Sequence, residues 1–270
     1  MLVLYHGDTS VCSQKVRLVL FEKDLEWSGK FIDLSKGDQF APEYIALNPN
    51  AVVPTLVDRD QVIIESTMIN EYLDDAFPEI PLRPADPYDK ARMRLWVKQL
   101  DDTVHYAINT ISFAIAFRRP LLALSEEERT ARYEGIPDPA RREKMKSLIT
   151  EGVKSPLMAE AIKRLDKLLG DMETRLDESE WLAGGTYSLA DTGLTPYVNR
   201  MAMLSLAPMW EQGRPRLTDW YARVKARGNY RSAVLDYDPP DRIKLMNEAG
   251  AELWPEIAPL VDGKTRTAAR

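Results

Sequence analysis

The sequence predicts a small α/β domain over residues 1–80, followed by a larger all-α domain over residues 89–270. Three observations support this division. Short apolar runs alternate with amphipathic stretches as far as Ala76, a proline cluster follows, and only helical patterns come after it. Proline lacks a backbone donor and clashes with the preceding turn, so such a cluster fits neither a helix interior nor a central strand. We interpret it as the linker, with prolines at Pro78, Pro81, Pro84 and Pro87.

The first domain is expected to have the element order βαβαββα. Short apolar runs predict strands, and apolar residues every three or four positions predict helices. The predicted strands cover residues 2–5, 30–33, 55–57 and 62–64, and the predicted helices cover residues 11–23, 42–47 and 66–76. The last two strands would form a hairpin whose turn is residues 58–61.

The second domain shows no strand pattern. Residues 89–117 carry a long helical pattern, in which Trp96, Leu100 and Val104 recur four positions apart. Further helices are expected over residues 157–176, 188–204 and 216–227. Residues 118–156 are rich in charge and interrupted by proline, so they form either a solvated insertion of short helices or a lid over a pocket. From Asp236 onward we expect a tail that ends in the polar, basic residues 264–270.

The composition excludes several classes of protein. The net charge is −6 and no run of Lys and Arg is interleaved with aromatic residues, so a nucleic-acid partner is not expected. Neither a signal-peptide pattern nor an apolar run of roughly 18 residues is present, so we expect neither secretion nor membrane insertion. Cys12 is the single cysteine, which favours a reducing, cytoplasmic location. Because the two histidines, His6 and His105, are far apart, no metal site is expected.

Ser10 stands where the first predicted helix begins. As a helix N-cap, its hydroxyl would accept a bond from the backbone N–H of Cys12 or Ser13, which is worth about 1 kcal/mol. The same place suits a chemical role, because a helix N-terminus and a nearby hydroxyl both stabilise a bound thiolate. A thiol has a pKa near 8.5, so lowering it by about 2 units would make the thiolate the major form at neutral pH.

Cys12 is the alternative reactive residue in this segment. A thiol in the first turn of a helix is where reactive cysteines occur. It could equally be a small buried apolar residue, since no second cysteine completes a Cys-x-x-Cys pair.

Three further motifs follow strands or begin helices. A cis bond before Pro54 would turn the backbone of Val53 outward as an edge that a peptide could pair with. Ser66 would be a helix N-cap, or it would hold a ligand carboxylate while Glu65 faces an ammonium group. Ser188-Leu-Ala-Asp191 reads as a capping box, which is a structural motif.

Four segments together resemble the glutathione transferase superfamily in order and spacing. They are Ser10-x-Cys-Ser-Gln-Lys-Val-Arg17, the sequence LNPNAVVPTL at residues 47–56, Glu65-Ser66, and Ser188-Leu-Ala-Asp191. The resemblance implies a thioredoxin-like first domain that binds glutathione and a helical second domain that carries the pocket for the electrophile. It also implies a homodimer.

The resemblance assigns roles to single residues. It implies that Pro54 is cis, that the Val53 backbone pairs with the cysteinyl part of glutathione, and that Glu65 and Ser66 hold the γ-glutamyl end. Gln39 is the match for the residue that binds the glycyl end. Asp101 would reach across to the partner's glutathione.

Ser10 matches the activating hydroxyl of the serine-type, theta- and zeta-like branches, whereas cysteine-type branches have their thiol at the position of Cys12. The charged insertion, the Pro-Asp-Pro within it and the extended tail resemble bacterial transferases similar to the lignin β-etherases. That would imply cleavage of an aryl ether by the glutathione thiolate. We expect a small hydrophobic, aromatic electrophile in an apolar pocket lined by Tyr106, Asn109, Phe113 and Tyr197. The alternatives are a non-catalytic binding protein and a Cys12-dependent glutathione disulfide reductase.

Overall fold

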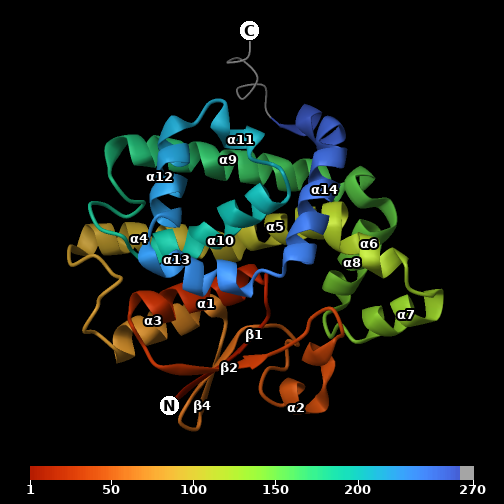
Figure 1. The fold of residues 1–270 in the computed structure, drawn as a ribbon, viewed down its shortest axis with the longest axis horizontal. Coiled ribbons are helices and arrows are strands. Elements are labelled where there is room, and N and C mark those ends of the chain that lie inside the picture. Colours follow the sequence, from red (N-terminus) through yellow and green to blue (C-terminus); the bar gives the residue numbers. More distant parts are fainter. Residues whose placement is uncertain (262–270) are drawn as a thin grey trace.

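The structure is a computed structural model, which describes residues 1–261. A small sheet with its helices forms one side of the molecule, and helices alone form the rest (Figure 1). The expected basic segment at residues 264–270 lies outside the described residues. Within residues 1–261, no helix combines the length and hydrophobicity that a membrane crossing requires.

The sheet has four strands in the order β2-β1-β3-β4. They are β1 (Leu2–His6), β2 (Trp27–Phe31), β3 (Thr55–Asp58) and β4 (Gln61–Ile64). β1 runs parallel to β2 and antiparallel to β3, and β3 and β4 form an antiparallel hairpin. Leu4, which is fully buried, pairs with Gly29 on one side and Leu56 on the other. β1 is therefore the central strand on which the first domain is built.

The helices of the first domain are α1 (Val11–Glu22), α2 (Pro42–Ile45) and α3 (Ser66–Ala76), with a 3-10 turn over Asp38–Phe40. α1 and α3 pack against each other, and the side chains of Leu18, Val19 and Ile69 are buried there. The predicted element order is confirmed. The second strand was predicted at residues 30–33 and forms earlier, because its pairing with β1 runs from Trp27 to Phe31.

The hairpin turn is shorter than predicted. Asp58 and Gln61 pair with each other, so only Arg59 and Asp60 connect the strands. Arg59 has a φ of 56°, in the left-handed region that two-residue hairpin turns require.

The linker after α3 is tied to the first domain through Asp74. This buried carboxylate accepts from Lys23 Nζ at 2.8 Å and from the backbone N–H of Leu82 at 2.8 Å. Arg83 Nε lies 2.6 Å from its other oxygen. The proline-rich linker is thus held against the first domain by a hydrogen bond and an ion pair to Asp74.

The second domain begins with one long helical stretch. α4 (Pro87–Gln99) starts at Asp86, whose carboxylate accepts from the N–H groups of Tyr88 and Asp89. A π-helical segment (Leu100–Val104), α5 (His105–Ser112) and a second π-helical segment (Phe113–Phe117) continue it. The predicted helix over residues 89–117 is confirmed, but with two π segments, which often occur at functional sites.

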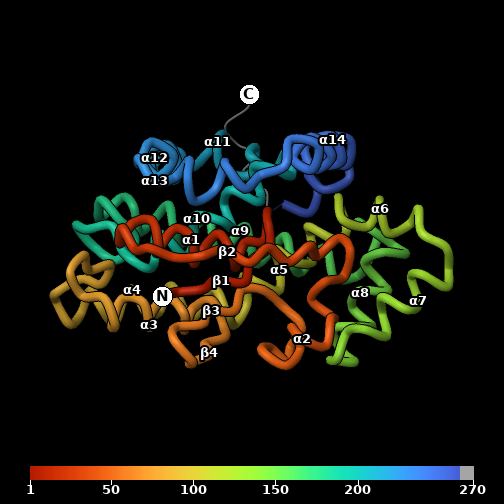
Figure 2. The backbone as a smooth tube through the Cα atoms, turned by 60° about the horizontal axis from the view of Figure 1, so that its bottom comes forward, coloured from red at the N-terminus to blue at the C-terminus, as the bar shows by residue number. Residues whose placement is uncertain are grey.

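The remaining helices complete the second domain. They are α6 (Arg118–Leu122), α7 (Glu126–Glu134), α8 (Pro139–Glu151), α9 (Leu157–Glu178), α10 (Leu189–Met203), α11 (Pro208–Glu211), α12 (Pro215–Lys225), α13 (Gly228–Ala233) and α14 (Pro240–Ile257). Short 3-10 turns cover Gly152–Lys154, Leu235–Tyr237 and Ala258–Leu260. In the smooth trace of Figure 2, α12, α13 and α14 lie along one edge of the molecule, and α13 packs against α1 of the first domain.

The expectation of a simple tail after Asp236 was wrong. α14 is an 18-residue helix that buries Met246, Ala249 and Ile257. Pro240 does not break it, because proline fits the first position of a helix, where its missing N–H has no partner to lose.

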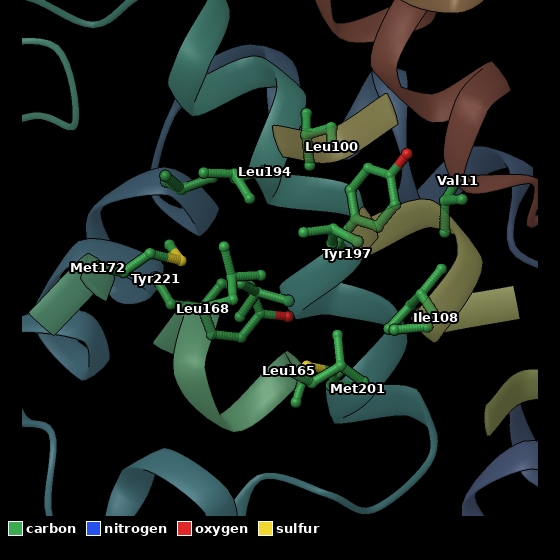
Figure 3. Close-up of a cluster of buried hydrophobic side chains, with 14 of the residues drawn as sticks. Val11, Leu100, Ile108, Leu165, Leu168, Met172, Leu194, Tyr197, Met201 and Tyr221 are labelled. Carbon is green, nitrogen blue, oxygen red and sulfur yellow. The ribbon is translucent and has the colours of Figure 1, made fainter. Parts of the chain in front are cut away.

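Buried apolar side chains from both domains form one continuous core (Figure 3). Val11 of α1 and Ile108 of α5 belong to the same cluster as Leu165 of α9, Leu194 of α10 and Tyr221 of α12. The two domains therefore share a hydrophobic interior.

The start of α10 depends on a buried carboxylate. Ser188 and Asp191 form the predicted capping box. The Asp191 carboxylate also accepts from the backbone N–H of Leu182 at 3.1 Å and from Trp220 Nε1 at 2.9 Å. Burial raises the pKa of Asp191, and these hydrogen bonds oppose that rise. Asp191 thereby joins α10, α12 and the loop after α9.

We predict that Asp191→Ala destabilises the protein by about 3–5 kcal/mol, because it leaves several buried donors without an acceptor. Ser188→Ala removes one cap and should cost about 1 kcal/mol. Urea unfolding of the two variants measures both values. Equal losses for the two variants would contradict the central role of Asp191.

Candidate active site

The loop between β1 and α1 carries the residues that begin the site. Two buried arginines hold its backbone. Arg17 donates to the carbonyl oxygens of Gly7 and Asp8, each at 2.8 Å, and Arg200 donates to the carbonyl of Thr9. Three successive carbonyl groups are thus fixed in front of α1.

The C-terminal part of the chain closes over the same loop. Arg17 Nε donates to the carbonyl of Ala233 at 2.8 Å, and its guanidinium lies 4.1 Å from the centre of the Tyr237 ring. Arg242 of α14 forms an ion pair with Asp8 at 2.7 Å. The position of the loop therefore depends on residues more than 200 positions later in the sequence.

Ser10 is the N-cap of α1. Its hydroxyl oxygen accepts from the backbone N–H of Ser13 at 3.3 Å. Ser13 in turn is buried, and its hydroxyl accepts from the backbone N–H of Gly7. The cap uses a lone pair of Ser10 and leaves its O–H proton able to donate to a sulfur atom. The structural and the chemical role of Ser10 are therefore compatible.

Cys12 lies at the centre of a polar cluster. Its Sγ is 3.5 Å from His105 Nδ1, and the hydroxyl of Tyr197 is 3.3 Å from the same nitrogen. Burial raises the pKa of the thiol, but His105, Lys15 and Ser66 outweigh it and lower the pKa to about 6. The surroundings of Cys12 thus favour its thiolate form.

His105 was not predicted as a site residue. It lies on α5, 93 positions from Cys12, and the charge of that thiolate is the main cause of its raised pKa. The two side chains are thus placed to form a thiolate–imidazolium pair. No local pattern in the sequence could have joined them, because the contact exists only when the fold brings the first residue of α5 close to the first turn of α1.

Lys15, Thr67 and Asp101 form a second polar chain beside this pair. Lys15 is almost fully buried and donates to the hydroxyl of Thr67 at 2.9 Å. Thr67 donates to Asp101 Oδ1 at 3.0 Å, and Lys15 Nζ is 3.9 Å from that oxygen. Asp101 is held by its own chain in this structure, and its reach towards a partner's glutathione stays a prediction.

The two strand-end motifs predicted for ligand binding have unusual backbone geometry. The Val53–Pro54 bond is cis. Glu65, with a φ of 67°, is the N-cap of α3, and its side chain makes no capping bond. The expectation that Ser66 is the cap was wrong, because the unusual backbone of Glu65 starts the helix one residue earlier. The first N–H groups of α3 therefore have no side-chain cap and can bind an anion.

Gln39 lies in the 3-10 turn after β2. The residue is 8% exposed, and its Oε1 has no hydrogen-bond partner within residues 1–261. A buried amide of this kind is available for a polar ligand group. Its predicted role at the glycyl end of glutathione stays a prediction.

The four side chains predicted for the electrophile pocket occupy two different environments. Tyr106, Asn109 and Phe113 share one side of α5 and the π segment after it, and Tyr106 is 42% exposed. Tyr197 of α10 is fully buried, and Figure 3 shows its hydroxyl at the edge of the apolar cluster. Tyr197 therefore lies behind the His105 imidazole, whereas the other three lie nearer the surface.

Within the described part of the chain, His, Cys, Asp and Glu side chains form no group of three that could hold a metal ion.

Two family models match the sequence, one in each domain. Residues 9–76 match the glutathione S-transferase N-terminal domain, and residues 155–223 match the glutathione S-transferase C-terminal domain. The chain belongs to the glutathione S-transferase family. The predicted family and the predicted two-domain fold are thereby confirmed.

Two proteins from Sphingobium bacteria are similar to this chain over most of its length. This transferase is 29% identical to protein LigF of Sphingobium sp. over 253 residues, which cover 92% of this chain and 98% of that protein. It is 30% identical to the tetrachloro-p-hydroquinone reductive dehalogenase of Sphingobium chlorophenolicum, with coverages of 85% and 94%. The crystal structure of the β-etherase LigF superposes with a TM-score of 0.80 at 30% identity and covers 86% of this chain and 98% of that one.

We predict that alkylation of Cys12 by iodoacetamide follows a pH profile with a midpoint of about 6. His105→Gln should move the midpoint upward, because the imidazolium no longer stabilises the thiolate. N-acetylcysteine under the same conditions supplies the intrinsic profile. A wild-type midpoint near 8.5, the value of a free thiol, would contradict the thiolate–imidazolium pair.

Proposed function

We propose that this glutathione-dependent transferase uses the glutathione thiolate to attack a small aromatic electrophile, including aryl ethers. The observation that carries the proposal is that the N-terminal ends of two helices lie side by side. α1 begins at Val11 with Ser10 as its N-cap, and α3 begins at Ser66 without a side-chain cap. Lys15 in α1 donates to Thr67 in the first turn of α3 at 2.9 Å. Such ends stabilise anions, and two of the anionic groups of glutathione would lie at them: the γ-glutamyl carboxylate and the reacting thiolate.

Glutathione is the co-substrate, and each part of it has a proposed partner. The α-carboxylate of its γ-glutamyl group would lie at the N–H groups of α3 with Ser66, and its ammonium would face the Glu65 carboxylate. The cysteinyl part would pair with the Val53 backbone beside Pro54, and Gln39 would receive the glycyl end. Two full charges on one ligand group explain why Glu65 and Ser66 stand side by side.

The thiol would then point to the start of α1. Ser10 donates its O–H to the sulfur and favours the thiolate, so no separate general base is required. With an aryl ether, the sulfur forms a bond to the carbon, the carbon–oxygen bond breaks, and the electron pair leaves with the aryloxide, which takes a proton from water. The names of the relatives LigF β-etherase and tetrachloro-p-hydroquinone reductive dehalogenase favour an aromatic substrate.

We also propose that the enzyme is a cytoplasmic homodimer. The single cysteine favours a reducing compartment. Asp101, whose side chain is half exposed, is available at the surface for contact with a second copy.

A second candidate function is thiol–disulfide exchange at Cys12, and the Cys12–His105 pair favours it. The thiolate would attack a glutathione mixed disulfide, take over the glutathionyl sulfur and release the other thiol. A second glutathione would then attack this new disulfide, restore the Cys12 thiolate and leave as oxidised glutathione. The net reaction consumes one mixed disulfide and one glutathione.

We predict that Ser10→Ala raises the pKa of enzyme-bound glutathione by about 1–2 units while glutathione still binds, because one hydrogen bond to the thiolate is lost. The pKa is measured from thiolate absorbance as the difference between the glutathione and S-methylglutathione complexes, which removes the signal of Cys12. Ser10→Thr retains both hydroxyl and cap and should restore the low pKa. If the pKa of bound glutathione is unchanged in Ser10→Ala, Ser10 serves only as the N-cap of α1 and does not activate the thiol.

For the second function, we predict that Cys12→Ser abolishes exchange with the mixed disulfide of glutathione and 2-mercaptoethanol. Conjugation of glutathione to 1-chloro-2,4-dinitrobenzene should continue in the same variant. Exchange at the wild-type rate would exclude a redox role for Cys12, and loss of conjugation would make Cys12 part of the transferase reaction.

A further inference from the structure

The charged insertion of the second domain reaches the first domain. In Figures 1 and 2, α7 and α8 lie beside the segment that carries α2. Arg132 of α7 donates to the carbonyl of Leu34 at 3.4 Å, and Phe40 packs against a small apolar cluster that contains Ile136 and Met145. The insertion of the second domain therefore packs against the first domain beside the candidate site.

Arg141 is the first of two cations on α8 that face this region. Its Nη1 donates to the carbonyl of Asn50 at 3.3 Å, three positions before Val53. Asp138 is a nearby acid, but one of its oxygens caps α8 by accepting from Ala140 N. No carboxylate within residues 1–261 forms an ion pair with Arg141.

Lys144 is the second cation, one turn further along α8. Its Nζ donates to the carbonyl of Tyr106 at 3.1 Å and lies 3.4 Å from the centre of the Tyr106 ring. It too has no ion-pair partner in the described part of the chain. Burial, and then the charge of Arg141, lower the pKa of Lys144 to about 7. The positive charge of Lys144 also acts to lower the pKa of His105, the partner of Cys12.

This arrangement is unfavourable unless an anion binds there. Two half-buried cations one turn apart repel each other, and partial burial removes the water that would otherwise stabilise them. Lys146 on the same helix shows the ordinary alternative, because it is exposed and pairs with Glu143 at 2.8 Å. An anionic ligand between Arg141 and Lys144 would supply the missing counter-charge.

We propose that Arg141 and Lys144 bind an acidic group, a carboxylate or phenolate, carried by the electrophile. The inference rests on the proposed function and narrows it to acidic aromatic substrates. The two side chains bridge Asn50 of the glutathione-binding loop and Tyr106 of the predicted electrophile pocket. An electrophile seated on Tyr106 next to the glutathione sulfur would therefore meet both cations.

A carboxylate could also come from the glycyl end of glutathione. The position of Lys144 favours the electrophile, because this side chain rests on α5, the helix that carries Tyr106 and Asn109. The glycyl end has its own proposed partner, Gln39, in the first domain. The two sources are distinguished by esterifying one carboxylate at a time.

The test uses product analogues, so that it does not depend on turnover. Isothermal titration calorimetry measures binding of S-benzylglutathione and of S-(3-carboxybenzyl)- and S-(4-carboxybenzyl)glutathione to the full chain. At least one carboxybenzyl analogue should bind wild type about tenfold tighter than the benzyl analogue, the size of one charge-assisted hydrogen bond. Arg141→Gln and Lys144→Gln should each abolish this preference and leave binding of S-benzylglutathione unchanged. Lys146→Gln, with the same charge change on the same helix, should retain it.

Three outcomes would overturn the inference. If wild type binds S-benzylglutathione but shows no carboxylate preference, the anion subsite fails while the proposed function stands. If wild type binds none of the analogues, both fail. If the variants weaken S-benzylglutathione itself but not its glycyl ethyl ester, the two cations serve glutathione and not the electrophile. Thermal unfolding of each variant, followed by circular dichroism, separates these results from a loss of folding.

Discussion

Two buried guanidinium groups determine where the reacting groups of this transferase stand. Arg17 and Arg200 donate to the carbonyls of residues 7, 8 and 9, and so fix the loop from which α1 starts. Ser10 and Cys12 follow directly on that loop. Because Arg17 also binds the carbonyl of Ala233, the site is completed only when the second domain has folded against the first. The shared apolar core and this hydrogen bond therefore both hold the two domains together at the site.

Much of the first domain could be predicted because its signals are local. Apolar runs and proline positions gave the element order, and the linker and the capping box at Ser188 were also correct. The errors arose where long-range pairing overrides local pattern. β2 starts at Trp27 because β1 sets its register, and α14 forms after two prolines because Met246 and Ile257 can be buried against the core.

The sequence could point to part of the candidate site because those signals are also local. Ser10, Glu65 and Ser66 stand at strand-to-helix junctions, which a sequence reveals. His105 does not stand at such a junction. It reaches the site only because the fold brings it next to Cys12, so neither its residue type nor its spacing in the sequence identifies it as a site residue. The cation pair on α8 was equally hidden: a charged, proline-interrupted segment resembles solvated surface until its contacts with Asn50 and Tyr106 are known.

The insertion between α5 and α9 has a consequence for how this fold diversifies. It is one contiguous stretch of chain, and it touches the first domain through the backbone carbonyls of Leu34 and Asn50 and the side chain of Phe40, none of which is proposed to bind glutathione. The two cations proposed to bind the electrophile, Arg141 and Lys144, are therefore encoded apart from Ser10, which is proposed to activate the thiol. Recombination or drift within the insertion can change which molecule is attacked while the nucleophile stays intact, which makes this segment a natural place for new specificities to arise.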